Sequence, residues 1–277
     1  MSVVLQISDP HFGTEQPLVV EALVAMARQQ RPDLLVLSGD ITQRARPAQF
    51  RAARAVIDRL GAPLLAIPGN HDIPLFNLWA RLRHPYARHT AAFGSDLEPV
   101  HLSPDLMVAC VNTTRAWRNK HGEVSPAQIE RVAGILANAT PAQLRVVVVH
   151  QPAAVARAED APNLLRGHAG ALQRWAAAGA DLVMGGHIHL PYVVDIVNAQ
   201  GLVDRMPVPG RTRPLWVVQA GTAVSSRVRK GVPNSVNLLR WGADSKPGSC
   251  GIEQWDFSAP EQAFVRVKLT LVHPARA

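Results

Sequence analysis

Five short apolar runs, rich in Val, Leu and Ile, each lead directly into an Asp, Asn or His. Runs of this length and composition are typical of buried strands in a largely parallel sheet. In such sheets, ligands bind beyond the carboxyl ends of the strands, where residues that are distant in sequence can meet. The runs are Val3–Ile7, Leu34–Leu37, Leu64–Ile67, Val146–Val149 and Leu182–Met184. The sequence therefore predicts an α/β protein with its functional site at one edge of the sheet.

A short polar motif follows each of these runs. Taken singly, each motif has a simple structural explanation, such as a turn, a helix cap or a hydrogen-bonded core histidine. Taken together, five strand ends carry side chains of the metal-ligand type and almost no other polar groups, which predicts a metal site. The motifs are Asp9-Pro10-His11, Gly39-Asp40, Gly69-Asn70-His71-Asp72, His150 and Gly186-His187-Ile188-His189.

The residue types indicate which chemistry this site supports. Imidazoles and carboxylates without thiolates suit Zn²⁺, Mn²⁺ or iron, and argue against a structural zinc site. Two such ions about 3.5–4 Å apart can clamp the attacking and leaving oxygens in phosphoryl transfer. Cations this close need an anionic bridge, for which Asp40 is the natural candidate. His71 suits a general acid for the leaving group, and Asp72 could either orient that imidazole or cap a helix.

Helical and strand patterns alternate through the first two thirds of the chain, and strands follow. Because the candidate ligands run from Asp9 to His189, we expect a single domain over residues 1–277. The segment 73–103, rich in His, Arg and Pro, directly follows a candidate ligand and is expected to cap the site. Helices are expected at 17–30, 47–60, 125–136 and 169–178, strands at 192–197, 215–219, 235–239, 252–257 and 264–272, and a second irregular stretch at 197–214.

Composition restricts the class and compartment of the protein. A hydrophobic content of 47% with 18% charged residues is ordinary for a soluble globular protein. Two cysteines, Cys110 and Cys250, indicate reduced thiols in a cytoplasm and no disulfide framework. The first residues lead directly into a strand, so no signal peptide is expected, and no apolar run approaches the roughly 18 residues of a membrane span. These features predict a cytoplasmic protein.

The net charge is +8 and the pI about 10.4, but the excess is spread thinly. Only Arg227-Val228-Arg229-Lys230 forms a tight cluster. Such charge fits an ordinary solvated surface, and it also fits attraction of a phosphorylated substrate or a nucleic acid. A nucleic-acid groove needs stacking aromatics, and aromatics make up only 5% of this chain. The expected partner is therefore a small phosphorylated substrate.

The series D-x-H, G-D, G-N-H-D, H and G-H-x-H resembles the calcineurin-like metallophosphoesterase superfamily, in order and with no ligand missing, from residue 1 to about residue 190. The resemblance implies a four-layer αββα sandwich of two mixed β-sheets flanked by helices. It also implies two divalent metal ions bridged by Asp40, with His71 as the general acid. By motif, it places Asp9, His11 and His189 on one ion and Asn70, His150 and His187 on the other.

Within the superfamily, the chain is most similar to the bacterial class III cyclic nucleotide phosphodiesterase branch. The similar segments are Gly39-Asp40-Ile41-Thr42 and His121-Gly122. Gln151 follows His150 where that branch often has a second histidine. The resemblance implies hydrolysis of a small phosphodiester. We expect His121 and Gln151, together with the cap at 73–103, to contact the substrate and to limit access to small phosphodiesters.

Other functions of the superfamily remain alternatives. They are a phosphomonoesterase, a nuclease and a nucleotide-sugar pyrophosphate hydrolase, although the lipid-A-pathway hydrolases of the last kind typically have Arg where this chain has His71. A protein of a different class would be a non-catalytic scaffold that kept the fold and lost the metals. The intact ligand set and His71 argue against a scaffold.

Overall fold

The computed structural model describes residues 2–196, 214–242 and 248–275. Its first β-sheet has six strands in the order β12-β11-β10-β1-β2-β3. β1 pairs in parallel with β2, and β2 with β3, whereas β10 joins β1 in the antiparallel direction and continues into two further antiparallel strands. The strands are β1 (Ser2–Ile7), β2 (Leu34–Ser38), β3 (Leu64–Ile67), β10 (Ser235–Trp241), β11 (Cys250–Ser258) and β12 (Ala263–Val272).

The second sheet also has six strands, in the order β4-β5-β6-β7-β9-β8. Its four central strands are parallel, and an antiparallel strand closes each edge. Both sheets are therefore mixed. The strands are β4 (Val100–Leu102), β5 (Leu106–Cys110), β6 (Leu144–Val148), β7 (Leu182–Gly185), β8 (Tyr192–Asp195) and β9 (Trp216–Gln219).

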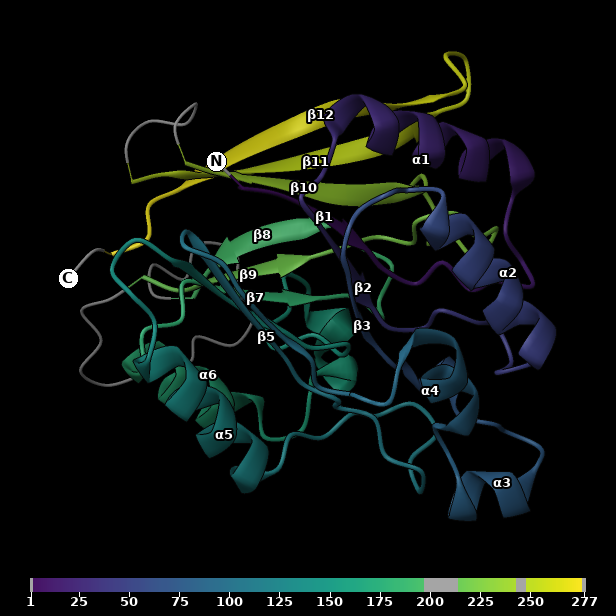
Figure 1. Cartoon of the computed structure of the whole chain (residues 1–277), viewed down its shortest axis with the longest axis horizontal. Helices are drawn as coiled ribbons and strands as arrows, with labels where there is room; N and C mark the ends of the chain where they lie inside the picture. The colour runs from purple at the N-terminus through teal and green to yellow at the C-terminus, as the bar shows by residue number, and fades with distance from the viewer. Residues whose placement is uncertain (1, 197–213, 243–247, 276–277) are drawn as a thin grey trace.

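Two pairs of helices cover the outer faces of the sheets (Figure 1). The helices α1 (Pro17–Gln30) and α2 (Pro47–Asp58) pack on the first sheet, and α5 (Pro126–Ala137) and α6 (His168–Ala177) pack on the second. Three of these helices begin with Pro. Pro suits the first position of a helix, because a backbone N–H there would have no partner within the helix. The result is the four-layer αββα sandwich expected from the sequence resemblance.

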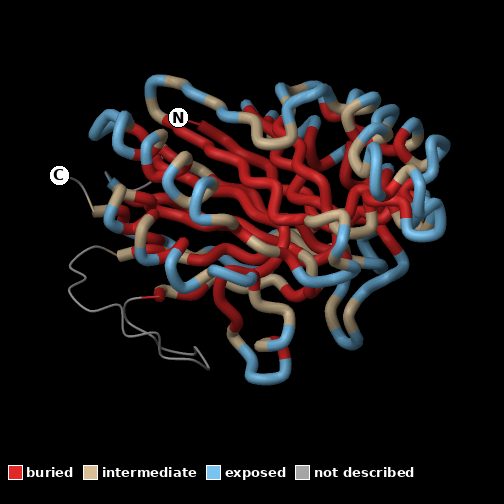
Figure 2. The backbone as a smooth tube through the Cα atoms, turned by 90° about the horizontal axis from the view of Figure 1, so that it is seen from below, coloured by how far each residue is buried: buried red, intermediate tan, exposed pale blue. Residues whose placement is uncertain are grey.

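The alternation of side chains along each strand builds the layers. In β1, Val3 and Leu5 face the helices of the first sheet, while Val4 between them belongs to the apolar layer between the two sheets. The same inter-sheet layer contains Val146 and Val148 of β6. Figure 2 shows this buried interior as a continuous red band. Both faces of β1, β2, β5, β6 and β7 are covered, and these strands are almost wholly apolar, whereas β12 at the edge of the first sheet is largely exposed.

Several short elements complete the fold. They are η1 (Asn70–Asp72), α3 (Leu78–Arg83), α4 (Ala87–Phe93) and η2 (Ala158–Asn163). The expected helix at 47–60 ends earlier, at Asp58, and most of the irregular stretch expected at 197–214 lies outside the described residues. No helix in the described part of the chain is long and apolar enough to span a bilayer.

Candidate metal centre

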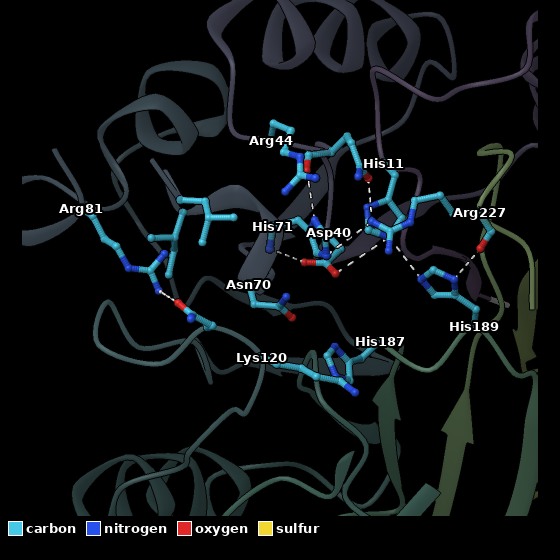
Figure 3. A pocket seen from close by; sticks show the side chains of 14 residues that line it. His11, Asp40, Arg44, Asn70, His71, Arg81, Lys120, His187, His189 and Arg227 are labelled. Atoms are coloured by element: carbon cyan, nitrogen blue, oxygen red, sulfur yellow. Dashed lines mark hydrogen bonds and ion pairs between the residues drawn. The ribbon is translucent and has the colours of Figure 1, made fainter. Parts of the chain in front are cut away.

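The motifs at the strand ends meet at one edge of the sandwich (Figure 3). The first sheet brings residues that follow β1, β2 and β3, and the second brings residues that follow β6 and β7. Eight non-glycine residues among those described have a positive φ, and five of them are candidate ligands. Left-handed backbone is costly for residues with a Cβ, and it concentrates at functional sites. The five are Asp9, His11, Asp40, His187 and His189, with φ between 43° and 73°.

One cluster contains Asp9, His11 and His189, whose ligand atoms all lie within 4.8 Å of one another. Nε2 of His189 lies 3.4 Å from Oδ1 of Asp9 and 3.1 Å from Nε2 of His11. Oδ2 of Asp9 is already occupied, because it accepts hydrogen bonds from Ser8 Oγ at 2.6 Å and His187 N at 2.8 Å. The free Oδ1 is the oxygen that faces the two imidazoles.

A second cluster contains Asp40, His150 and His187. Oδ1 of Asp40 lies 3.3 Å from Nε2 of His150, and its Oδ2 lies 3.9 Å from Nε2 of His11 in the first cluster. The two oxygens of Asp40 therefore face different groups of imidazoles. The ring of His187 meets that of His150 edge-on, with the centroids 5.2 Å apart.

Buried polar atoms test whether these residues fit metal ions. Five atoms of the candidate ligands are buried without a hydrogen-bond partner: Asp9 Oδ1, His11 Nδ1, Asn70 Oδ1, His150 Nε2 and His187 Nδ1. An unpartnered buried polar atom is costly, so an atom of this kind calls for an explanation. Oxygen and imidazole nitrogen that converge from two clusters are the donors a divalent cation prefers. The residues present fit a pair of such ions.

Backbone carbonyls hold the imidazoles in orientation. Nδ1 of His150 donates to the carbonyl of Ser38 at 2.9 Å, and Nδ1 of His189 donates to that of Arg227 at 2.6 Å. These bonds place the proton on Nδ1, so the lone pair of each Nε2 points into the cluster. Carbonyl partners of this kind orient metal-binding histidines and make them more basic.

The electrostatics of the site attract positive charge. Burial alone would lower the pKa of His150, but the carboxylate of Asp40 at 3.3 Å outweighs it and raises that pKa to about 9. Burial would raise the pKa of Asp40, and His150 nevertheless holds it well below its usual range. Burial lowers the pKa of His11 to about 4 and that of His187 to about 3. His150 is therefore protonated when no metal is bound and would have to release that proton to a metal ion, because ionised carboxylates and neutral imidazoles are the forms that bind metal.

His71 lies beside the clusters with its ring edge-on to His11, the centroids 4.8 Å apart. Its Nδ1 donates to the carbonyl of Gln43 at 3.0 Å, which leaves Nε2 facing the cavity. Asp72 accepts its hydrogen bonds elsewhere, from the backbone N–H groups of Gly69, Ile41 and Thr42 and from the Thr42 hydroxyl. Of the two interpretations of Asp72, the geometry favours the one in which it fixes local backbone, because Gln43 orients the imidazole.

A cavity of about 390 Å³ opens over the clusters. Its lining includes five polar residues that sequence reasoning did not place at the site: Gln43, Arg44, Asn119, Lys120 and Arg227. Gln43 and Arg44 follow Gly39-Asp40-Ile41-Thr42 directly, Asn119 and Lys120 precede His121-Gly122, and Arg227 belongs to the charge cluster 227–230. Figure 3 shows Arg44, Lys120 and Arg227 around the candidate ligands.

The two residues expected at the substrate do not line this cavity. His121 is exposed. Gln151 is fully buried, where its Oε1 accepts from Thr113 Oγ1 at 2.5 Å and its Nε2 reaches the carbonyl of Lys120 at 3.4 Å. Gln151 therefore contacts the loop that carries Lys120 from the buried side of that loop.

Only the beginning of the expected cap, residues 73–103, borders the cavity, through Ile73, Leu75 and Arg81. The rest joins the body of the protein. In α4, His89 is fully buried with its ring packed against Phe93, and β4 pairs with β5.

Comparison with known proteins agrees with this arrangement. Residues 2–191 match the model of a family described as calcineurin-like phosphoesterase, which covers every candidate ligand. The chain belongs to this family. The calcineurin-like phosphoesterases use a dinuclear metal centre, and the Asp and His clusters of this chain supply groups that could hold one.

Two relatives and one solved structure show how similar this chain is to known proteins. The chain is 28% identical over 204 residues to a cAMP/cGMP dual specificity phosphodiesterase of Mycobacterium tuberculosis, and the match covers 68% of this chain and 61% of that protein. It is 52% identical over 44 residues to a glycerophosphodiester phosphodiesterase of Enterobacter lignolyticus, 16% of either protein. A dimetal phosphatase of Danio rerio has the same fold, with a TM-score of 0.67 at 14% identity over 99% of both chains.

Proposed function

We propose that this calcineurin-like phosphoesterase hydrolyses a small phosphodiester at a pair of divalent metal ions, Mn²⁺, Zn²⁺ or iron. The observation that carries the proposal is the division of Asp40, whose Oδ1 faces His150 and whose Oδ2 faces His11. A carboxylate that shares its oxygens between two groups of imidazoles is the bridge that two nearby cations require. Asp9, His11 and His189 would hold one ion, and Asn70, His150 and His187 the other.

Such a pair would supply positive charge at the phosphate and would lower the pKa of a nearby water. His71 then has the remaining task of giving a proton to the departing oxygen. Its Nδ1 is bound to the carbonyl of Gln43, so Nε2 is the atom that carries the transferable proton. Asp72 positions His71 indirectly. It accepts hydrogen bonds from the backbone N–H of Ile41, which follows Asp40, and from that of Gly69, which precedes Asn70.

The cavity supports a small anionic substrate. A volume of about 390 Å³ lies within the range of small-molecule sites. Arg44, Arg81, Lys120 and Arg227 bring four cations to its wall, whereas Asp40, a proposed metal ligand, is its only acidic lining residue among those described. Both relatives named above are phosphodiesterases, one of cyclic nucleotides and one of glycerophosphodiesters. We propose a cyclic nucleotide-like diester, bounded by the first part of the cap at 73–103.

A substrate panel tests this function. Purified protein with added Mn²⁺ should hydrolyse bis-p-nitrophenyl phosphate, a diester, faster than p-nitrophenyl phosphate, a monoester. Cyclic AMP, glycerophosphodiesters, nucleoside diphosphate sugars and single-stranded DNA complete the panel. Preference for the monoester, the sugar nucleotide or the DNA would replace the phosphodiesterase proposal with the corresponding alternative. A protein that retains no metal and hydrolyses none of them would be a scaffold.

We further propose a cytoplasmic enzyme that forms one domain over residues 1–277. Both cysteines are free thiols buried in the inter-sheet layer, and burial raises the pKa of Cys250 to about 12. Thiols that stay buried and protonated form no disulfide, which fits the reducing conditions of a cytoplasm. Mass spectrometry of the protein after alkylation under native and denaturing conditions tests whether both thiols are reduced in cells.

A further inference from the structure

Six large apolar side chains are exposed together beside the cavity. Thirteen such side chains are exposed in the described part of the chain, and these six come from two short neighbouring segments. Concentrated apolar exposure marks interaction sites, whereas single exposed residues do not. The six, which we call the α3 platform, are Leu75 (38% exposed), Phe76 (83%), Leu78 (67%), Trp79 (68%), Leu82 (74%) and Trp117 (72%).

A buried arginine joins the two segments of the platform. Arg81 of α3 is only 7% exposed, although it stands between exposed residues of the same helix. Its guanidinium donates to the carbonyls of Ala116 at 2.6 Å and Arg118 at 2.8 Å, the two residues that flank Trp117. Trp117 is thereby fixed next to α3. The buried guanidinium of Arg81 therefore holds the two segments of the platform together.

The platform is continuous with the mouth of the cavity. Leu75 belongs to both, and Arg81 lines the cavity beneath the platform. In Figure 1, α3 lies at the outer end of the molecule, beyond the sheets and the other helices. A flat partner could therefore contact α3 and lie close to the cavity.

The charge around the platform selects the kind of partner. The segments 75–84 and 115–120 contain five Arg or Lys residues and no Asp or Glu, and Glu123 just beyond them pairs with Arg118 at 2.6 Å and Arg115 at 3.9 Å. Arg83 and Lys120 are exposed, and Arg44 lies over the ring of Phe76 at 5.8 Å. A second copy of the chain would oppose these cations with cations of its own, which is unfavourable. An anionic partner with an apolar interior would match both the charge and the apolar side chains.

We propose that the α3 platform docks the protein on an anionic lipid membrane. Trp residues favour the headgroup region of a bilayer, where the ring is partly buried and the indole N–H stays hydrated. Trp79 and Trp117 would occupy that region, Leu78 and Leu82 would reach the acyl boundary, and Arg83 and Lys120 would contact anionic headgroups. Docking of this kind is peripheral, and binding to vesicles measures it separately from turnover.

Vesicle binding of the full-length protein tests the proposal. The probes are sedimentable vesicles of phosphatidylcholine alone and of equal parts phosphatidylcholine and phosphatidylglycerol. We expect binding to the mixed vesicles only, with a blue shift of tryptophan fluorescence that high salt reverses. The double variant Trp79→Ser/Leu82→Ser should bind roughly tenfold more weakly or worse, because two apolar side chains no longer leave water. Leu18→Ser is the matched control, since Leu18 is 49% exposed on α1.

Three results would overturn the proposal. The first is a wild-type protein that does not bind the mixed vesicles, and the second is a double variant that binds them as tightly as wild type. The third is a wild-type dimer in light scattering that the double variant dissociates, which would make the platform a contact between copies. Circular dichroism of each variant establishes that its fold is intact.

Discussion

Arg227 and His71 face each other at the cavity wall, with Nη1 of the arginine 3.5 Å from Nε2 of the imidazole. Gln43 holds both, because its carbonyl accepts from His71 Nδ1 and its Oε1 accepts from Arg227 Nη1 at 2.8 Å. The backbone carbonyl of Arg227 also fixes His189. Arg227 lies beyond residue 191, where the match to the family model ends. Arg227 therefore contacts both His189, a proposed metal ligand, and His71, the proposed acid, and it lines the cavity proposed for the substrate.

We expect Arg227→Met to lower turnover of a phosphodiester by roughly 10²-fold, the scale for loss of one donor that stabilises transition-state charge. Metal content should persist, because the backbone carbonyl that orients His189 remains. Steady-state kinetics and metal analysis on the same preparation check both statements. Lys230→Met removes an equal charge nearby and should change little. Equal losses in the two variants would reduce Arg227 to a general contribution to surface charge.

His71→Ala should keep its metals and lose turnover by about 10²–10⁴-fold, the usual contribution of a general acid. The loss should be smaller for bis-p-nitrophenyl phosphate, because p-nitrophenolate leaves without needing a proton. A series of diesters with leaving groups of increasing pKa measures this dependence. An identical loss across the series would exclude proton donation by His71.

Asp40→Asn should lose metal as well as activity. The substitution removes the negative charge that offsets repulsion between two nearby cations. Metal analysis after gel filtration should give clearly less metal per protein chain than wild type. Asp58→Asn is a suitable control, because Asp58 is an exposed helix residue that pairs with Arg54. Full metal content in Asp40→Asn would contradict the proposed bridge.

The stability of the fold should fall on acidification because of His89. Both ring nitrogens of this buried side chain lack a hydrogen-bond partner, and burial lowers its pKa from 6.5 to about 4. Between these values the unfolded chain binds a proton that the folded chain does not, so stability decreases as the pH falls from about 6.5 to about 4. The full effect is about 3 kcal/mol.

Denaturant titrations of wild type and His89→Leu over this pH range measure the effect. Leu keeps an apolar side chain between α2 and α4 and removes the titrating group, so the curve of stability against pH should flatten. His273→Leu, at an exposed position, controls for the loss of a histidine. A variant as pH-sensitive as wild type would assign the acid sensitivity to other groups.

The sequence predicts the strands well and points to the candidate ligands that the structure brings together, because both depend on local patterns. An apolar run buried on two faces has a recognisable composition, and a ligand at its end is the next residue or two along the chain. The order of strands is different, because it depends on long-range pairing. No local signal places β10 beside β1, where Leu239 pairs with Val4.

The wall of the cavity could not be predicted for a related reason. Arg227 and Lys120 enter it from loops, whose paths are set by tertiary contacts such as those of Arg81. Gln151 was expected at the substrate because it follows His150. The chain bends after β6, and the side chain of Gln151 turns toward Thr113, away from the cavity.

The left-handed backbone at Asp9, His11, Asp40, His187 and His189 has a consequence for the evolution of this protein. Gly adopts that conformation at less cost than His or Asp. Selection for thermal stability alone, without selection for turnover, should therefore replace residues at these positions first. Such replacements would stabilise the fold and inactivate the enzyme. Natural function is what keeps this edge of the sandwich less stable than the same chain could make it.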